Sequence, residues 1–586
     1  MRGSAHESWW GFLVIYLRPL WRKFLLMSVL LLSGIGLQLG APQVAGTFID
    51  TARAGGALGT LTTLALLYLA LAVANQLATG FSAYLGQDVG WTATNHLRED
   101  LALHCLRLDM PFHNAHTPGE LIERVDGDLT ALSDFFSIVI IRVVGGALPL
   151  LGTLALLWRG DWRIGLALTL FVAIMVAVLV AMRRVAIPAG VQERDSSALF
   201  LGFLEERLGG VEDLRANGGG DYVMLRFYET MRRWFQRGVH AWLRRSSIWT
   251  VTSLLFSLGT ALVLGMSAYL FFQHAITLGQ VYLFFQYTTL LQGPLEQITQ
   301  QLQEFQKAVS SLTRVREVLR IQPGIVDGTA AFAEQPRADG GVAVVFDGVT
   351  FAYDDEGPVL RDLAFDIAPG QVVGLLGRTG SGKTTISRLL FRLYDTTAGA
   401  IRLDGSDVRE VPLAALRARV GLVTQDVQLF HASIRDNLTF FDRSIPDARI
   451  LGVIAEMGLN EWFERLPNGL DTELDAGGEG LSAGEAQLLA FIRVFLQQPG
   501  LVILDEPSSR LDPATERLIE RGVGALLRGR TGIIIAHRLA TVQRADAILV
   551  IENGRLLEYG PREELARQPD SRFAALLRVG MEEVLV

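Results

Sequence analysis

The sequence predicts a multi-domain chain in which an all-α polytopic membrane domain is followed by an α/β domain with a phosphate-binding loop. Two patterns predict this fold class. The first 302 residues hold six mostly apolar segments long enough to cross a bilayer, which takes about 20 residues of helix. After residue 342, short apolar runs alternate with helical segments, as in a sheet covered by helices.

Length and composition agree with a membrane protein of more than one domain. A chain of 586 residues is too long for one ordinary core, and its charged fraction of 19% lies below the roughly 25% of soluble proteins. The net charge of −8 gives no reason to expect nucleic acid as a partner. The single cysteine, Cys105, excludes an intrachain disulfide.

The predicted spans alternate with short and long loops. They cover residues 24–48, 61–85, 135–158, 164–182, 248–272 and 278–302. The long stretches after the second and fourth spans are rich in arginine, so the positive-inside rule places them in the cytoplasm together with the N-terminus. Helical periodicity continues into both stretches and is interrupted near 111–119 and 209–220.

Arg142 stands out because charged residues are rare inside the predicted spans. An intramembrane charge is costly and normally faces protein or a water-filled cavity, which makes Arg142 a candidate cavity residue. An arginine near the end of its helix that reaches a lipid headgroup or a structural partner explains the pattern equally well.

A change in composition marks the domain boundary. Residues 323–341 are rich in glycine, proline, alanine and aspartate without periodicity, as expected of a linker. We therefore assign residues 1–322 to the membrane domain and 342–586 to the α/β domain. Strands are expected at 342–346, 372–376, 420–423, 501–504, 532–536 and 547–551.

A glycine-rich loop follows one expected strand and opens an expected helix. Its residues are Gly377, Arg378, Thr379, Gly380, Ser381, Gly382, Lys383, Thr384 and Thr385. The glycines let backbone N–H groups approach phosphate, and Lys383 reaches the outer phosphates. The hydroxyl of Thr384 is placed to ligate magnesium. With a strand before it and a helix after it, this motif predicts that ATP binds here.

An acidic pair follows the buried-type strand 501–504. Ligands of open α/β sheets bind at the carboxyl ends of the strands, where Asp505 would hold Mg²⁺ and Glu506 would polarise the attacking water. The alternative, an acidic pair that caps a helix, is disfavoured because the phosphate motif shares the domain. His537 ends another strand and could contact the γ-phosphate, although a strand-end histidine is more often structural.

With these motifs in this order, the chain resembles a bacterial ABC exporter half-transporter, in which six spans are fused to one nucleotide-binding domain. The resemblance covers nearly all of the chain. It implies the ABC exporter fold, ATP hydrolysis coupled to transport, and a location in the bacterial inner membrane with the nucleotide-binding domain in the cytoplasm. The mostly apolar spans fit an amphipathic or hydrophobic substrate, such as a lipid, a drug or a peptide.

The resemblance implies further contacts with nucleotide. Tyr353 resembles the aromatic residue that stacks on adenine, and Gln425 the glutamine that ligates magnesium and senses the membrane domain. Ser509 and Asp512 belong to the segment that resembles the D-loop. The segment that resembles the signature motif, which contacts ATP held by another subunit, is Leu481, Ser482, Ala483, Gly484 and Glu485. The breaks near 113–119 and 208–215 resemble coupling helices, and in this family the second reaches the partner's nucleotide domain.

The chain departs from the family pattern in its signature. The family sequence is Leu-Ser-Gly-Gly-Gln, and here it is Leu-Ser-Ala-Gly-Glu. Ala483 adds a methyl group where backbone passes close to phosphate, and Glu485 adds a negative charge beside a negative nucleotide. Arg510 also stands where the D-loop usually has alanine. Just upstream, the segment 475–478 lacks the acidic residue at its usual place in the family pattern.

These departures favour pairing with a different half-transporter. In such a heterodimer the intact loop 377–385 and Glu506 would face a partner's intact signature, and the altered signature would face a site that hydrolyses slowly. A homodimer with tolerated variants remains the alternative, because Ser482 and Gly484 are present. Two other readings are an importer built on the exporter architecture and a soluble mechanical ATPase, and the six apolar segments argue against the latter.

Overall fold

The computed structural model describes residues 9–135, 140–333, 340–353, 357–424, 427–475, 481–505, 513–535 and 542–579. The chain divides into two compact units. Unit 1 comprises Met1–Leu106 and Pro118–Ile321, and unit 2 comprises Arg107–Thr117 and Gln322–Val586. Unit 1 is helical and unit 2 combines sheets with helices, so the predicted fold class is confirmed.

Unit 1 consists of long helices joined by short turns. The helices are α1 (Trp9–Leu17), α2 (Trp21–Arg53), α3 (Leu58–Arg107), α5 (Pro118–Ile122), α6 (Asp128–Asp134), α7 (Ile140–Gly160), α8 (Trp162–Gly209), α9 (Val211–Ala216), α10 (Gly220–Phe272), α11 (Leu278–Leu290) and α12 (Gln292–Arg320). A 3-10 turn at Arg18–Leu20 joins α1 to α2, and a π-helical turn at Glu123–Gly127 joins α5 to α6.

Four helical stretches in the described part of the chain are long and apolar enough to cross a membrane. They are Val14–Arg53, Leu58–Arg107, Trp162–Gly209 and Gly220–Phe272. The segment expected as a third span lies in α7 and partly outside the described residues, and the sixth is divided between α11 and α12 at Leu291. The side chain of Arg142 is outside the described part, so its role stays a prediction.

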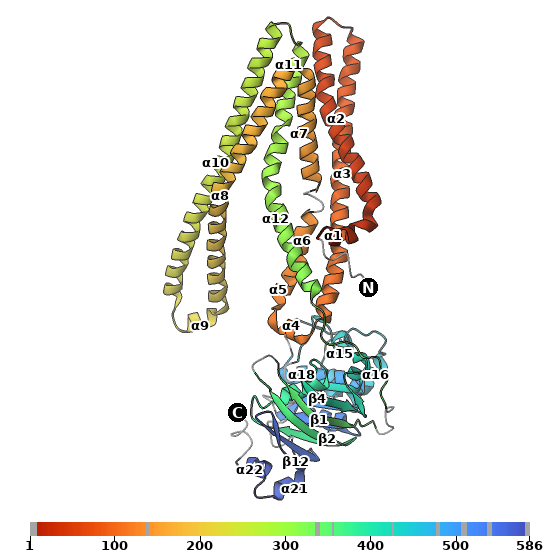
Figure 1. Cartoon of the computed structure of the whole chain (residues 1–586). Helices are drawn as coiled ribbons and strands as arrows, with labels where there is room; N and C mark the ends of the chain where they lie inside the picture. The colour runs from red at the N-terminus through yellow and green to blue at the C-terminus, as the bar shows by residue number, and fades with distance from the viewer. Residues whose placement is uncertain are drawn as a thin grey trace. The chain divides into compact units, whose positions relative to one another are not determined.

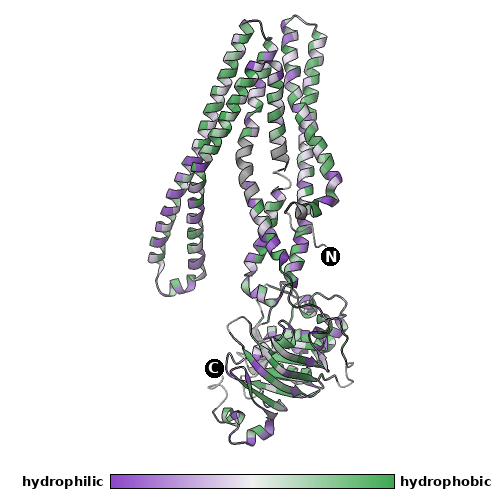
Figure 2. Cartoon of the chain, in the orientation of Figure 1, coloured by the Kyte–Doolittle hydropathy of each residue, from purple (hydrophilic) through white to green (hydrophobic). Residues whose placement is uncertain are grey.

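The longest helices extend well beyond a bilayer. At about 1.5 Å per residue, the 48 residues of α8 span roughly 70 Å, whereas a hydrocarbon core is about 30 Å thick. Helices α8 and α10 pack along each other and are joined by α9 (Figure 1). Hydrophilic residues gather at their α9 ends and hydrophobic residues along the remainder (Figure 2). The α9 end therefore has the polarity of a water-exposed segment.

Hydrogen bonds to the carboxylate of Asp50 join α2 to the start of α11. Asp50 accepts hydrogen bonds from the Thr277 hydroxyl at 2.6 Å and from the Gly279 backbone N–H at 2.8 Å. Thr277 and Gln280 form a capping box that begins α11. A Cβ at Gly279 would overlap the backbone oxygen of Gly46, so this crossing requires glycine.

Unit 2 is built around a six-stranded sheet of order β12-β11-β3-β10-β9-β6. Its strands are β3 (Val372–Leu376), β6 (Val420–Val423), β9 (Leu501–Asp505), β10 (Thr531–Ile535), β11 (Ala547–Glu552) and β12 (Arg555–Pro561). The pairs are parallel except that of β11 with β12. All residues of β3 and β10 are buried, as expected of central strands covered on both faces.

The other described strands form a second, antiparallel sheet of order β2-β1-β4-β5 and a two-stranded antiparallel pair of β7 with β8. They are β1 (Val344–Phe351), β2 (Leu360–Ile367), β4 (Ala398–Leu403), β5 (Ser406–Asp407), β7 (Ala432–Ser433) and β8 (Glu473–Leu474). The helices of unit 2 are α4 (Met110–Ala115), α13 (Lys383–Leu390), α14 (Leu413–Arg419), α15 (Ile434–Thr439), α16 (Asp447–Glu456), α17 (Asn460–Phe463), α18 (Ala483–Gln497), α19 (Pro513–Leu527), α21 (Arg562–Arg567) and α22 (Arg572–Val579), with a 3-10 turn at Gly469–Asp471.

Unit 2 includes a segment that the predicted boundaries placed in the membrane domain. Helix α4 packs on the sheet domain, where the Asn114 amide donates to the Tyr394 hydroxyl at 2.9 Å. Asp109, just before α4, accepts hydrogen bonds from the backbone N–H groups of Gly324 and Ile325. The first part of the predicted linker is therefore attached to unit 2 by hydrogen bonds.

Candidate nucleotide site

The sheet topology of unit 2 aligns the ends of four parallel strands at one edge. Ile535 at the end of β10 is paired with Leu375 of β3 on one side and with Asp505 of β9 on the other. Val423 at the end of β6 is paired with Leu504. The loop 377–382 leaves this edge after β3, so the phosphate motif and Asp505 lie on the side of the sheet where such folds bind ligands.

The loop between β3 and α13 depends on its glycines. Gly382 directly precedes α13 with φ of 106°, a conformation that L side chains rarely adopt. A Cβ at Gly382 would lie 2.5 Å from a methyl group of Leu360, so a larger residue would also clash. Gly380 has φ of 80° and an open position for a Cβ. The backbone conformation at these two positions therefore favours glycine, which leaves the backbone N–H groups there uncovered by side chains.

Two polar side chains of the phosphate motif, Lys383 and Ser381, are buried. Lys383 is only 6% exposed, and its ammonium group donates to the backbone oxygens of Gly377 at 2.6 Å and Arg378 at 3.1 Å. The hydroxyl of Ser381 is buried and has no hydrogen-bond partner in the described part of the chain. A phosphate oxygen would satisfy both groups, so the residues fit a nucleotide. Thr384 is exposed beside them, as a metal-ligating hydroxyl must be.

Tyr353 is held close to the phosphate loop by its hydroxyl. This hydroxyl lies 3.0 Å from the Thr385 hydroxyl and accepts a hydrogen bond from the Arg388 guanidinium at 3.2 Å. The ring also makes an edge contact with Tyr394 at 5.1 Å between centroids. Thr385 is buried, so its side chain serves this internal contact. The sequence did not point to Arg388, because only the fold brings α13 beside Tyr353.

Several predicted site residues lie outside the described part of the chain. They are Gln425, Glu506, Ser509, Asp512 and His537. The ends of the preceding strands are described: β6 leads toward Gln425, β9 into Glu506 and β10 into His537. These strands end at the same edge as β3, so the predicted roles of the three residues stay compatible with the sheet topology.

The signature segment begins α18 with a capping box. The Glu485 carboxylate accepts hydrogen bonds from the Ser482 backbone N–H at 2.9 Å and from the Ser482 hydroxyl at 3.0 Å. The Glu485 backbone N–H donates in turn to the Ser482 hydroxyl at 3.3 Å. The Ser-x-x-Glu spacing in the sequence is a capping-box signal. The backbone N–H and the hydroxyl of Ser482 are therefore already bonded to a carboxylate of the helix that they precede.

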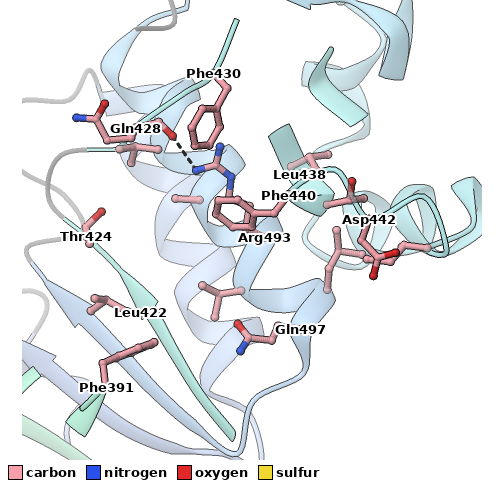
Figure 3. A pocket seen from close by; sticks show the side chains of 16 residues that line it. Phe391, Leu422, Thr424, Gln428, Phe430, Leu438, Phe440, Asp442, Arg493 and Gln497 are labelled. Atoms are coloured by element: carbon pink, nitrogen blue, oxygen red, sulfur yellow. Dashed lines mark hydrogen bonds between the residues drawn. The ribbon is translucent and has the colours of Figure 1, made fainter. Parts of the chain in front are cut away.

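A groove of about 680 Å³ lies between the strand-end region of β6 and α18 (Figure 3). Its lining is mostly apolar, including Phe391, Leu422 and Phe430. Arg493 of α18 donates to the Gln428 backbone oxygen at 3.0 Å, and its guanidinium lies over the Phe440 ring at 4.7 Å. Burial lowers the pKa of Arg493 from its ordinary value.

A phosphate loop, an acidic strand end and membrane-length helices in one chain define an ATP-binding membrane protein. Comparison with known proteins identifies its family. The family model described as "ABC transporter" matches residues 360–509, and that described as "ABC transporter transmembrane region" matches residues 24–295. The chain is 30% identical over 559 residues to an uncharacterized ABC transporter ATP-binding protein, YfiC, of Bacillus subtilis, covering 94% of this chain and 92% of that protein.

Two further relatives agree along almost the whole chain. An ATP-dependent lipid A-core flippase of Alcanivorax borkumensis is 29% identical over 580 residues, which is 97% of each chain. The solved structure of a bacterial Atm1-family ABC exporter with ATP bound superposes with a TM-score of 0.79 at 25% identity, covering 96% of this chain and 98% of that one. The chain belongs to the ABC transporter family and has the fold of an exporter half-transporter. It binds ATP and couples its hydrolysis to transport across a membrane.

Proposed function

We propose that this chain is one half of a heterodimeric exporter in the bacterial inner membrane, and that it supplies the catalytic carboxylate of the hydrolysing site. The observation that carries the proposal is the capping box of the signature segment. A phosphate from a partner's ATP would approach the N-terminus of α18 and the Ser482 hydroxyl. In this chain the Glu485 carboxylate already accepts hydrogen bonds from Ser482.

The charge of Glu485 distinguishes this signature from one that ends in glutamine. A glutamine could form the same capping box without a charge. Two negative charges about 4 Å apart repel by about 1 kcal/mol in water and about 4 kcal/mol at the lower effective dielectric of a protein surface. The altered signature is therefore expected to hold ATP less well than an intact one, or to turn it over more slowly.

The loop 377–385 with Glu506 would form the productive site opposite a partner's intact signature. Thr384, Gln425 and Asp505 would hold Mg²⁺, which supplies positive charge to the phosphates when it is bound. Glu506 would orient the attacking water, and His537 would contact the γ-phosphate. Tyr353 would stack on adenine. The buried ammonium of Lys383 and the unpartnered hydroxyl of Ser381 support phosphate binding at this loop.

The groove next to α18 would receive a helix from the membrane half of the partner. Its mostly apolar lining would accept an exposed apolar side chain of a short helix such as α9, where Val211 is 45% exposed. Closure of the nucleotide domains by two ATP molecules would thus be passed to the membrane helices. ATP shifts the equilibrium toward the closed state because it binds that state more tightly than the open one.

Export of an amphipathic or hydrophobic molecule, including a lipid, is the proposed transport reaction. The similarity to a lipid A-core flippase and to an ABC exporter supports it, as do the mostly apolar helices. A homodimer would show full activity from this chain alone. An importer on the same fold would accumulate substrate on the opposite side of oriented vesicles.

The pairing is tested by assaying the purified chain alone and with candidate partners. We expect weak ATP hydrolysis alone and strong hydrolysis with a half-transporter that has Leu-Ser-Gly-Gly-Gln and lacks the catalytic glutamate. Glu485→Gln should raise the activity of the chain alone, because the repulsion is removed while the capping box is kept. Glu506→Gln should abolish hydrolysis in both settings while ATP still binds. Robust ATPase activity of the unmodified chain without a partner would refute the heterodimer.

A further inference from the structure

A second hollow of unit 2 is lined by arginine. It measures about 560 Å³ and lies between α19, the end of α16 and the segment that contains Arg544. Its four arginines are Arg517, Arg521, Arg528 and Arg544. The residues that line it are separate from the phosphate loop 377–385, and neither the family motifs nor the comparisons assign a role to it.

Three of these arginines lie on one face of α19 with a glycine between them. At about 100° per residue, Arg517, Arg521 and Arg528 fall within about 40° of one another around the helix axis, and Gly524 lies on the same face. A Cβ at Gly524 would lie 3.2 Å from a guanidinium nitrogen of Arg544. Glycine inside a helix is less favourable than alanine. The absence of a side chain at Gly524 leaves space in the hollow for the guanidinium of Arg544.

The hollow has more positive charge than its carboxylates neutralise. Glu456 and Glu520 also line it, which leaves an excess of two positive charges in a chain whose net charge is −8. Arg544 donates to the Glu520 backbone oxygen at 2.7 Å and lies 3.8 Å from its carboxylate. Arg521 and Arg528 form no hydrogen bond or ion pair with the described part of the chain. Arg517 and Arg521 are four residues apart, a spacing at which like charges destabilise a helix, and an anion bound between them would offset this repulsion.

We propose that this hollow is an anion site that binds a small multivalent phosphate, either a free polyphosphate or the phosphate chain of a nucleotide. Guanidinium groups bind phosphate oxygens in pairs, and arginines approaching from two elements would enclose a di- or triphosphate. The volume lies within the range of small-molecule sites. The proposal does not depend on how the chain pairs or on what it transports.

The test uses the full-length chain in detergent with Lys383→Ala, which removes phosphate binding at the loop 377–385. Titration calorimetry measures binding of tripolyphosphate and of ATP. We expect both to bind, and Arg521→Gln with Arg528→Gln to weaken binding at least tenfold. Arg567→Gln is the matched control, because this arginine is 81% exposed on α21 and outside the hollow. Equal affinities for tripolyphosphate and ATP would show that the site recognises the phosphate chain. An affinity for ATP at least tenfold higher than that for tripolyphosphate would show that it recognises a nucleotide.

A second variant separates binding from folding. Gly524→Ala favours the helix but places a methyl group against Arg544, so it should weaken tripolyphosphate at least several-fold without lowering the temperature of unfolding. Absence of tripolyphosphate binding on the Lys383→Ala background would overturn the proposal, provided that thermal unfolding shows a folded chain. Unchanged affinity in the variant that lacks both Arg521 and Arg528 would overturn it as well.

Discussion

The ion pair between Asp128 and Arg314 gives a prediction whose size depends on which partner is removed. Arg314 of α12 donates to both oxygens of Asp128 in α6, with its Nε at 3.0 Å, and Arg124 lies 3.6 Å away. The Asp128 side chain is 1% exposed, whereas that of Arg314 is 38% exposed. Loss of Arg314 therefore leaves a buried carboxylate, but loss of the Asp128 charge leaves an arginine that can turn toward water.

The two substitutions are expected to differ in cost. Arg314→Met removes the main partner of a buried charge, which typically costs about 3–5 kcal/mol. Asp128→Asn keeps the shape and loses charge-assisted hydrogen bonds, which are worth about 1.5–3 kcal/mol. For a domain of this size, a loss of 1 kcal/mol lowers the unfolding temperature by roughly 2 °C. Arg314→Met should therefore lower it by about 6–10 °C and Asp128→Asn by about 3–6 °C.

Tryptophan fluorescence of the detergent-solubilised chain, heated at one fixed rate, measures these shifts. Arg226→Met is the control, because its pair with Glu229 is exposed to solvent and should contribute little to stability. Asp128→Leu combined with Arg314→Met should be less destabilising than the sum of the two single changes, since no charge is left buried. An Asp128→Asn variant that is as unstable as Arg314→Met would refute the argument from burial.

Three further predictions concern packing, pH and nucleotide. Gly279→Ala should destabilise unit 1 by about 1–3 kcal/mol, seen as a lower unfolding temperature, because its methyl group would overlap the Gly46 backbone oxygen. Burial by itself would raise the pKa of Asp407, but the hydrogen bonds from the Arg409 side chain and backbone, together with the charges of Arg409 and Arg402, lower that pKa below its ordinary value. The pair of Asp407 with Arg409 therefore stabilises unit 2 above about pH 4, and this stabilisation is lost as the pH falls further. Arg409→Gln should be less stable than the parent at pH 7, and the two stabilities should converge in acid. Lys383→Ala should abolish ATP hydrolysis, measured as release of phosphate. ATP hydrolysis retained in this variant would contradict the role of the phosphate loop.

The sequence predicted the class of both domains because its patterns are local. Apolar segments of membrane length and a buried strand followed by a glycine-rich loop are visible without any tertiary contact. The motif 377–385 was expected to follow a strand and to open a helix, and it does follow β3 while its last three residues begin α13. The membership of α4 in unit 2 could not be predicted, because it depends on contacts such as that of Asn114 with Tyr394, far apart in the chain.

The candidate site was predictable in its residue types and only partly in its contacts. The Ser482–Glu485 capping box follows from a four-residue spacing, so its signal was present in the sequence. The contact of Tyr353 with Thr385 and Arg388 and the arginines around Gly524 were not predictable, because each joins elements that only the packed fold brings together.

By itself, then, the sequence determined that this protein has an ATP-handling domain attached to membrane helices, since short motifs and apolar length are enough for that. Only the tertiary structure decided that strands β3, β10 and β9 end side by side, so that the phosphate loop and Asp505 share one edge. It also decided which charges are buried, such as that of Asp128. Hydrogen-bond pairing across a sheet and burial depend on distant parts of the chain, and local sequence does not encode them.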